Sequence, residues 1–391
     1  MRRGARRVAE TLFELPFGAT TIRAWTSARV TEVEGPRLAG PPPPVRPLLE
    51  RALDAPVGSE RVEQRVRAGD RVTLVVSDAT RDEPRAELIA AVLDRLPEVR
   101  LTVAIASGTH GPTRGALPSG LEALAGRVHV LVDHDGHDDR DLVTVGTTAR
   151  GTPVIVHRAV VDADMVVATG VIRPHYFAGW GAGAKAIFPG LGQAAAIRIN
   201  HRGKTDPTAR PGAVDDNVCR LDLEEAAAMA APRSFLLDGV ADAHGQVRGA
   251  VSGCLRAAFR AGVDLARPWV TRAAPRSRCI VVSDLAPVTD SLYQASKLVA
   301  AVAHLLLPGG TVVVVAPCPR GVGPVDVVNQ SIYEIGLRPR LPADHRILLV
   351  SGCPAAEVSA TYALAVDSLQ DAIRGADDLL VVRGASKLLL E

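Results

Sequence analysis

Residues 169–190, TGVIRPHYFAGWGAGAKAIFPG, gather chemically useful side chains within an otherwise apolar run. Three aromatic residues and four glycines precede Lys185, and Arg173 is the only other charged residue. An ammonium buried among Gly, Ala, Ile and Phe is costly unless it loses its charge, pairs with an anion or becomes covalently attached. The segment is therefore predicted to hold a ligand, with Lys185 as its anchor.

The glycines of this run do not form a known nucleotide-binding motif. A phosphate loop reads G-x-x-x-x-G-K-[ST], whereas Ala184 precedes and Ala186 follows the lysine in this chain. The spacing is not G-x-G-x-x-G either. The glycines thus indicate close backbone packing around a ligand without specifying a phosphate.

Two shorter segments add groups that could bind or react. Asp78-Ala79-Thr80-Arg81 offers an arginine able to clamp a carboxylate or phosphate with two hydrogen bonds. Asp78 would hold a ligand hydroxyl, orient a neighbour, or simply cap a helix. The loop at 107–112, SGTHGP, offers His110 as a general base, or as an ordinary histidine of a surface loop.

Three further groups leave two interpretations open. His201 is either a metal ligand or a histidine stabilised at a helix C-terminus. Tyr293 and Lys297 are four residues apart on a predicted helix, so Lys297 either receives a carboxylate or is an exposed helical lysine. The run 133–139, DHDGHDD, lacks the register of a calcium loop and is predicted to be a polar turn.

These segments sit on an alternation of β-branched runs and helical stretches. Strands are expected at 72–77, 101–106, 128–132, 142–145 and 165–168, with helices near 86–96 and 193–201. This order predicts a doubly wound α/β sheet, in which the loops after strand ends collect ligands. The segments at 78–81, 107–110 and 169–175 are all predicted to be loops of this kind, each directly after a strand.

The pattern restarts after a break at 266–278. Further strands are expected at 280–283, 311–316, 347–350 and 379–382, with a helix at 291–306, and a proline run at 41–44 serves as a rigid linker. We predict an N-terminal cofactor-binding α/β domain over 1–270 and a smaller α/β domain over 271–391. Both would have mainly parallel sheets, with a cleft between them for a small molecule.

Charge and composition exclude several classes of function. Lys and Arg total 45 against 43 Asp and Glu, and this near balance argues against a nucleic-acid surface. No uncharged apolar run approaches the ~20 residues that span a bilayer, and the basic N-terminus lacks the apolar stretch of a secretory signal. The five cysteines form no C-x-x-C pair, so free thiols and a cytoplasmic location are expected.

The ordered motifs together resemble the lactate racemase family, whose members use a nickel-pincer nucleotide. The strongest match is R-P-H-Y-F-A-G-x-x-x-G-A-K-A-I-F-P-G at 173–190, followed by Asn200-His201. In the same order the chain carries S-D-x-T-R at 77–81, S-G-T-H at 107–110, R-x-D-x-x-E-A at 220–226 and L-Y-Q-x-x-K at 292–297. The resemblance extends from the LPFG near Leu15 to the helix of Lys297.

The resemblance implies roles for matching residues. Lys185 would be joined through a thioamide to the cofactor, a pyridinium-3-thioamide-5-thiocarboxylic acid mononucleotide that carries nickel, and His201 would ligate the metal. His110 and His175 would be the two acid/base groups, one on each side of the substrate carbon. The other implied contacts are Asp78, Thr80, Tyr176, Phe177, Pro189 and Tyr293 to the cofactor, and Arg81, Gln294 and Lys297 to the substrate. Enzymes of cofactor maturation would be transient partners.

The implied reaction is racemisation or epimerisation of a 2-hydroxy acid. Because a carboxylate already neighbours the α-carbon, losing its hydrogen as a proton would accumulate charge, whereas losing it as hydride leaves a neutral 2-keto acid. The cofactor would carry that step and the protein would supply position and electrostatics. A dehydrogenase or lyase using the same tethered cofactor, and a non-catalytic cofactor carrier, are the alternatives.

The chain departs from the family pattern at a few positions. Asp82 stands where Pro is expected after Arg81, and Gly181-Ala182 replaces Ser-Gly. The C-terminal region shows no obvious match to an aromatic lid residue. These differences suggest a 2-hydroxy acid other than lactate, or epimerisation of a larger hydroxy acid.

Overall fold

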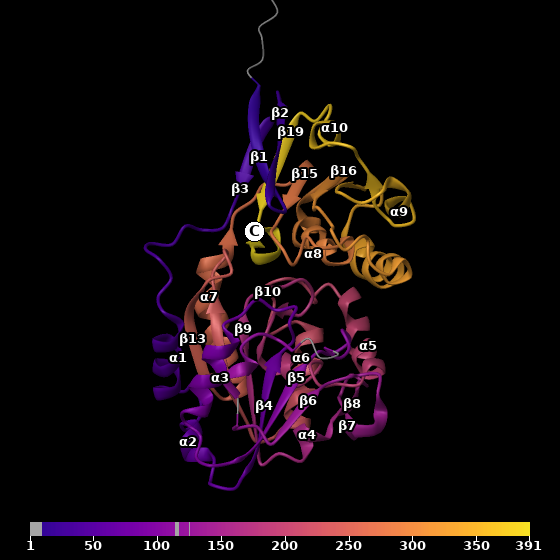
Figure 1. Ribbon diagram of the computed structural model, residues 1–391. Helices are drawn as coiled ribbons and strands as arrows, with labels where there is room; N and C mark the ends of the chain where they lie inside the picture. Colours follow the sequence, from indigo (N-terminus) through magenta and orange to yellow (C-terminus); the bar gives the residue numbers. More distant parts are fainter. Residues whose placement is uncertain (1–9, 114–116, 125) are drawn as a thin grey trace, which may run out of the picture. The chain divides into compact units, whose positions relative to one another are not determined.

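The computed structural model describes residues 10–113, 117–124 and 126–391, and the chain forms two compact units (Figure 1). The larger unit is Leu38–Trp269, and the smaller unit joins the segment ending at Arg37 to Val270–Glu391. Each unit is built on a six-stranded, mainly parallel sheet, so the predicted α/β class is confirmed.

The larger unit has a doubly wound sheet of order β13-β12-β9-β4-β5-β6. Its strands are β4 (Arg71–Ser77), β5 (Arg100–Ala106), β6 (Val130–Asp133), β9 (Met165–Ile172), β12 (Ser234–Ala241) and β13 (Val247–Gly253). The chain moves outward from β4 through β5 and β6 and then returns to the other side of β4 with β9. All pairs are parallel except β12 with β13. Strand order reverses between β4 and β9, where sheets of this kind bind ligands.

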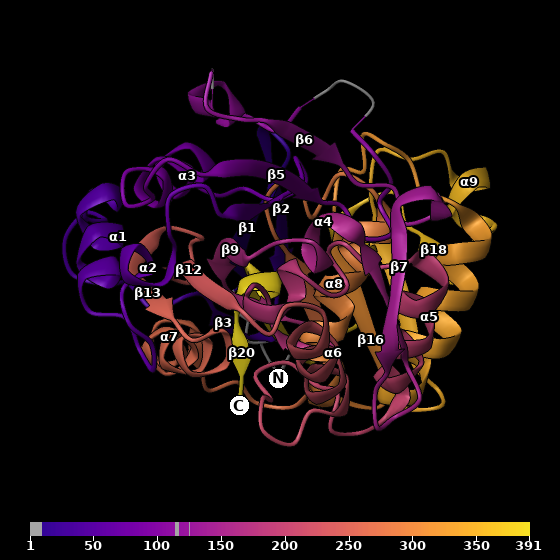
Figure 2. The same ribbon diagram turned by 90° about the horizontal axis from the view of Figure 1, so that it is seen from below.

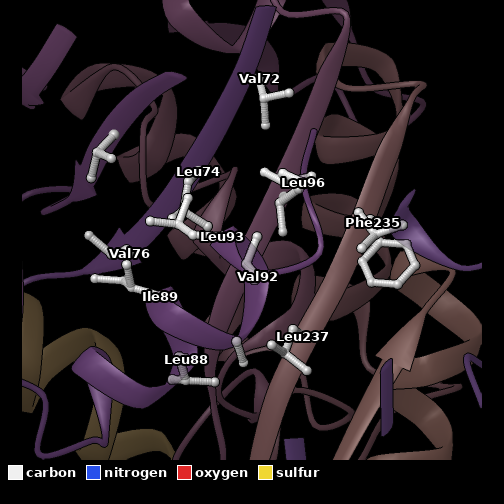
Figure 3. Close-up of a cluster of buried hydrophobic side chains, with 14 of the residues drawn as sticks. Val72, Leu74, Val76, Leu88, Ile89, Val92, Leu93, Leu96, Phe235 and Leu237 are labelled. Carbon is white, nitrogen blue, oxygen red and sulfur yellow. The ribbon is translucent and has the colours of Figure 1, made fainter. Parts of the chain in front are cut away.

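Helices cover this sheet and build its core. They are α1 (Val45–Asp54), α2 (Val62–Arg65), α3 (Arg85–Leu93), α4 (Arg158–Val161), α5 (Ala194–Arg202), α6 (Val218–Ala230) and α7 (Leu255–Val270), with single turns η1 (Leu121–Leu124), η2 (Asp139–Asp141), η3 (Gly183–Ala186) and η4 (Gly203–Thr205). α1 and α3 lie side by side against β13, β12 and β9 (Figure 2). Leu74 and Val76 of β4, Ile89 and Val92 of α3 and Phe235 of β12 belong to one hydrophobic cluster, and all are fully buried (Figure 3). This packing anchors the carboxyl end of β4.

One predicted strand of this sheet lies elsewhere. β7 (Leu142–Thr147) pairs antiparallel with β8 (Pro153–His157) and with no strand of the main sheet. The connection is short and turns at Gly151, whose φ is +85°. A parallel partner would need a crossover of a dozen or more residues, so the short turn yields a hairpin.

The smaller unit has a sheet of order β18-β17-β16-β15-β19-β3, parallel throughout. Its strands are β3 (Arg29–Val33), β15 (Ser277–Ser283), β16 (Leu306–Val315), β17 (Arg346–Val350), β18 (Leu364–Ala365) and β19 (Asp378–Arg383), with the pairs β1 (Thr11–Phe17) and β2 (Thr20–Thr26), and β14 (Thr271–Arg272) and β20 (Leu389–Leu390). Its helices are α8 (Leu292–Val302), α9 (Ala355–Ser359), α10 (Leu369–Ala372) and the π-type η6 (Val327–Leu337), with turns η5 (Ala303–Leu305), η7 (Arg338–Arg340) and η8 (Ala385–Lys387).

The predicted domain boundaries need one correction. The larger unit ends at Trp269, and residues 10–37 fall in the same unit as the C-terminal part and not with the predicted domain 1–270. The cause is a long-range pairing of β3 with β19, together with burial of Phe13 and Leu15 in the core of the smaller unit. Among the described residues, no helix has both the length and the apolar character needed to cross a bilayer.

Candidate active site

Three polar segments leave neighbouring strands where the order of the larger sheet reverses. β4 is hydrogen-bonded to both β5 and β9. Asp78 follows the last residue of β4, and the loop of His110 follows β5, as predicted. β9 continues to Ile172, so residues 169–172, expected in a loop, are strand, and the third loop begins at Arg173. The parallel ladder thus brings Asp78, His110 and Arg173 to one edge of the sheet.

Asp78 and His110 form a carboxylate–histidine pair. Oδ2 of Asp78 lies 2.7 Å from Nδ1 of His110, and Oδ1 accepts from the backbone N–H and hydroxyl of Thr80 at 2.9 and 2.5 Å. Burial alone would raise the pKa of Asp78, but the hydrogen bond and charge of His110, with the Thr80 hydroxyl, lower it to about 2. Asp78 is therefore an anion at neutral pH that orients His110. Orienting a neighbouring side chain is one of the two functional roles that the sequence leaves open for Asp78.

A buried arginine fixes the loop that carries Arg81. Arg85 donates to the carbonyls of Ser77, Asp78 and Arg81 at 3.0, 2.9 and 3.1 Å, and is itself 3% exposed. Arg81 is exposed at the surface of the loop. The buried carboxyl of Glu83 lies 3.9 Å from Arg85, and burial raises the pKa of Glu83. Sequence reasoning assigned no role to Arg85, because it lies beyond the S-D-x-T-R motif.

His175 lies on the short strand β10 (Pro174–His175), which pairs with β11 (Gly179–Trp180). The backbone N–H of Ala178 donates to Nδ1 of His175 at 3.2 Å. Since Nδ1 accepts, Nε2 carries the proton of the neutral ring. Tyr176 stacks on the imidazole at 5.1 Å between ring centroids, and Phe177 meets it edge-on at 4.8 Å. The adjacent aromatics therefore hold the ring in place.

Phe177 lies near both His201 and Lys185. Its ring centroid lies 4.8 Å from that of His201 and 5.6 Å from Nζ of Lys185. Burial, followed by the charges of Lys185 and Lys204, lowers the pKa of His201 to about 3, against a small opposing effect of the Ile197 carbonyl. Nδ1 of His201 is buried without a hydrogen-bond partner of good geometry among the described residues. The predicted metal ligand is thus a neutral imidazole beside the predicted anchor.

The loop of His110 is joined directly to the loop of Lys185. The N–H of Gly108 donates to the carbonyl of Gly190 at 2.9 Å, and a Cβ at Gly108 would meet the carbonyl oxygen of Pro189 at 3.4 Å. Gly108 also has φ of +56°, a region that favours glycine. These features place the Ser107–His110 loop against the predicted cofactor-contacting Pro189.

Buried polar residues from two other elements hold the segment between His175 and Lys185. Arg220 of α6 is fully buried and donates to the carbonyls of Ala178, at 3.3 Å, and Trp180. Asp238 of β12 accepts the N–H of Gly183 at 2.9 Å. Burial raises the pKa of Asp238 to about 8, so it is protonated at neutral pH, and lowers that of Arg220 to about 10, so it stays charged.

A second buried carboxylate holds the end of α5. Asp222 accepts from the hydroxyls of Thr148 and Thr152 at 2.5 and 2.6 Å and from the amide of Asn200 at 2.7 Å. Asn200 directly precedes His201, so Asp222 fixes the turn that presents the imidazole. Arg220 and Asp222 lie in the R-x-D-x-x-E-A motif, which sequence analysis noted without assigning their functions. No sequence signal identified Asp238.

The acidic run 133–139 forms a turn, as predicted. His134 is buried and its Nε2 lies 3.0 Å from the carbonyl oxygen of Gly192. The N–H of Ala194 donates to the carbonyl of Gly136 at 2.7 Å, which ties the turn to the start of α5. Within the described ranges, no group of three or more His, Cys, Asp or Glu side chains is arranged to bind a metal ion.

The predicted residues Tyr293, Gln294 and Lys297 lie on α8 of the smaller unit. Ser291 caps this helix by accepting the N–H of Gln294, and Nζ of Lys297 donates to the side-chain oxygen of Gln294. Lys297 and Gln294 therefore form one polar group on the first turns of α8.

The fold and these residues define a class of protein: a doubly wound α/β enzyme with a carboxylate–histidine pair and a lysine-bearing glycine loop where strand order reverses. A family model described as the lactate racemase N-terminal domain matches residues 24–212. The lactate racemase of Lactiplantibacillus plantarum is 29% identical over 285 residues, 70% of this chain and 66% of that protein. The lactate racemase of Thermoanaerobacterium thermosaccharolyticum is 26% identical over 339 residues, 78% of this chain and 79% of that protein.

Solved structures show the same fold. The lactate racemase apoprotein of T. thermosaccharolyticum matches with a TM-score of 0.83 at 20% identity, over 97% of this chain and 100% of that chain. A Thermotoga maritima protein matches with a TM-score of 0.64 at 17% identity, over 91% and 100% of the two chains. The sequence and fold comparisons together support a racemase of the lactate racemase family, within the isomerase class of enzymes.

Proposed function

We propose that this protein racemises or epimerises a 2-hydroxy acid with a nickel-pincer nucleotide bound to Lys185. The observation that carries the proposal is the grouping of a neutral His201, Phe177 and Lys185 on elements tied to the loop of His110. We place the enzyme in the cytoplasm, in keeping with its five free thiols.

The residues present fit this cofactor. Nickel is bound by neutral imidazole, and burial keeps His201 neutral and leaves its Nδ1 without a hydrogen-bond partner of good geometry in the described structure. The amine of Lys185 lies on the same aromatic ring as His201, where a thioamide would remove its charge. Tyr176, Phe177 and Pro189 would supply apolar contacts to the pyridinium ring, and Asp78, Thr80 and Tyr293 would supply polar ones.

The chain's own residues would position the substrate and move its hydroxyl proton. When bound, the cofactor supplies an acceptor for the α-hydrogen with its electron pair. His110 donates through Nδ1 to Asp78, so its Nε2 accepts the hydroxyl proton, and the Asp78 anion stabilises the resulting imidazolium. Nδ1 of His175 accepts a hydrogen bond from the N–H of Ala178, so Nε2 carries the proton and would donate it to the oxygen of the 2-keto acid.

The family resemblance assigns the substrate carboxylate to Arg81 and Lys297, and Gln294 lies beside the lysine. Arg81 is exposed on a loop that Arg85 fixes, and Lys297 is hydrogen-bonded to Gln294. A planar guanidinium can bind a carboxylate with two parallel hydrogen bonds. Asp82 adds a negative charge beside Arg81, which favours a substrate other than lactate.

The test is a racemisation screen. The protein is produced with the cofactor maturation enzymes and incubated with single enantiomers of lactate and of larger 2-hydroxy acids, followed by chiral chromatography. The proposal predicts a mixture of enantiomers with no net oxidation, lost in His110→Gln and His175→Gln variants that still contain nickel. Net 2-keto acid would indicate a dehydrogenase, a cleaved or dehydrated product a lyase, and nickel binding without turnover a carrier.

Cofactor attachment is tested separately by intact-mass spectrometry and metal analysis. Lys185→Met is expected to lose the covalent adduct, whereas Lys297→Met keeps the adduct and loses substrate affinity. His201→Ala is expected to lose nickel, with the exposed His137→Ala as a matched control. An adduct of unchanged mass in Lys185→Met, or full nickel occupancy in His201→Ala, would remove that residue from its role.

A further inference from the structure

Two cysteines face each other at the carboxyl ends of adjacent strands in the smaller unit. Val315 of β16 pairs with Val350 of β17, and the ladder continues as the N–H of Gly352 donates to the carbonyl of Pro317 at 3.0 Å. The next residues are Cys318 and Cys353. The thiol Sγ of Cys353 lies 3.6 Å from the carbonyl oxygen of Cys318.

This placement satisfies the main geometric requirement for a disulfide. Neighbouring strands run about 4.8 Å apart. A disulfide spans Cα separations of about 4.4–6.8 Å. The two cysteines belong to the same unit, and Sγ of Cys353 already reaches the backbone of Cys318, so we expect bond formation to need side-chain rotation with only local backbone adjustment.

The two thiols differ in accessibility. Cys353 is partly exposed, whereas Cys318 is 3% exposed. Burial, together with the neighbouring Cys353, raises the pKa of the Cys318 thiol to about 12. An oxidant would therefore reach Cys353 first, and Cys318 would react in a second, slower step. Of the other three thiols, only Cys254 is partly exposed, and it lies in the larger unit.

Cys318 begins the loop that fixes the first turn of α8. The N–H of Cys318 donates to the carbonyl of Thr289 at 3.0 Å. The N–H groups of Leu292 and Tyr293 donate to the carbonyls of Gly321 and Val322 at 3.3 and 3.1 Å. A cross-link at Cys318 would therefore act on the segment that holds the start of α8.

We propose that Cys318 and Cys353 are an oxidisable dithiol whose closure to a disulfide clamps the loop 318–323 against the first turn of α8. The oxidant is a low-molecular-weight disulfide such as oxidised glutathione. The thiolate of Cys353 attacks it and releases one small thiol, and the sulfur of Cys318 then attacks Cys353 and releases the second. Two protein thiols are oxidised, one small disulfide is reduced, and the two thiol protons pass to the released thiols. Since Gln294 and Lys297 of α8 are proposed to bind the substrate, any effect of this clamp on substrate affinity rests on that proposed function.

The test uses the full chain without cofactor or substrate, so failure of the proposed function does not affect it. Reduced protein is incubated with oxidised glutathione, and intact mass and non-reduced peptide maps are recorded. Wild type and Cys254→Ser are expected to lose two hydrogen atoms and give one cross-linked peptide pair joining Cys318 to Cys353. Cys353→Ser is expected to give neither. Five titratable thiols after oxidation, a glutathione adduct that never closes, or a hydrogen loss that survives in Cys353→Ser would overturn the site.

Hydrogen exchange tests the clamp. On oxidation, the amides of Gly321, Leu292 and Tyr293 are expected to exchange at least ~3-fold more slowly, and to recover after reduction. Cys353→Ser treated in the same way should show no change. A disulfide that forms without slowing these amides would overturn the link to α8.

Discussion

Asp238→Asn tests whether a protonated acid supports the loop between His175 and Lys185. Asp238 is fully buried, and its Oδ2 accepts the N–H of Gly183 at 2.9 Å. The amide oxygen of Asn can accept the same hydrogen bond, and its NH2 group would replace the second oxygen, which has no hydrogen-bond partner among the described residues. The substitution therefore keeps the shape and the contact but removes the titration.

The expected effect follows from the raised pKa of Asp238. Burial raises it from 3.8 to about 8, so between these values the unfolded chain loses a proton that the folded chain keeps. The free energy of unfolding then falls as pH rises, by at most about 1.4 kcal/mol per pH unit from this group, and the loss is complete above pH 8. From pH 5 to pH 7 this amounts to a ceiling of about 2.7 kcal/mol, and relaxation around the carboxylate reduces it to ~1–2 kcal/mol.

Urea unfolding at pH 5, 6, 7 and 8, followed by tryptophan fluorescence and circular dichroism, measures this effect. At pH 5 the Asn variant and wild type should agree within ~1 kcal/mol, and by pH 8 the variant should be the more stable protein. Asp238→Ala removes the acceptor for Gly183 and should lose ~1–3 kcal/mol at every pH. Asp264→Asn, at an exposed position, controls for the general effect of replacing a carboxyl group by an amide. Parallel pH profiles for wild type and Asp238→Asn would refute a protonated Asp238.

Two further substitutions probe the other carboxylates. Asp222→Ala leaves the donors of Thr148, Thr152 and Asn200 without their buried acceptor, so it should lose at least ~3 kcal/mol in urea unfolding; an effect below ~1 kcal/mol would contradict this role. Asp78→Asn removes the anion beside His110 and should lower kcat of the loaded enzyme at least ~10-fold. Because the pKa of Asp78 falls to about 2, the free energy of unfolding of the wild type should include about 2 kcal/mol above pH 4 from this group. This contribution should be lost as the pH falls towards 2 and should be absent from the variant. Full kcat in Asp78→Asn would exclude the orienting role.

The strand ends of the larger unit could be predicted because their signals are local. The buried runs of β4 and β5 are rich in β-branched residues, and the polar residues that follow each run mark where the strand ends and its loop begins. The end of β9 was placed too early, because residues 169–172 continue the strand. The alternation with helices gave the doubly wound order, and that order brings Asp78 and His110 together. The pairing of these two side chains could therefore be expected from sequence as one of several possibilities.

The supporting residues could not be predicted because burial depends on distant parts of the chain. Asp238 lies on β12, which the sequence pattern did not predict. The burial that raises its pKa exists only in the folded chain, where its side chain accepts the N–H of Gly183. The pairing of β3 with β19 joins segments about as far apart as the chain allows, so the N-terminal segment was assigned to the wrong unit. Neither feature leaves a periodic pattern near the residues concerned.

The loop of Lys185 illustrates why such support is needed. Gly183 has φ of +64°, and a Cβ there would meet the ring of Phe259 at 2.6 Å, so glycine is required for both conformation and packing. Glycine loses more conformational entropy on folding than any other residue, and this loop contains several. Arg220 and Asp238 offset that cost from outside the loop, with hydrogen bonds to the carbonyls that precede Gly183 and to its N–H. An apolar run with few charges can therefore fix the backbone that carries a lysine, because buried ionisable groups of neighbouring elements bind that backbone.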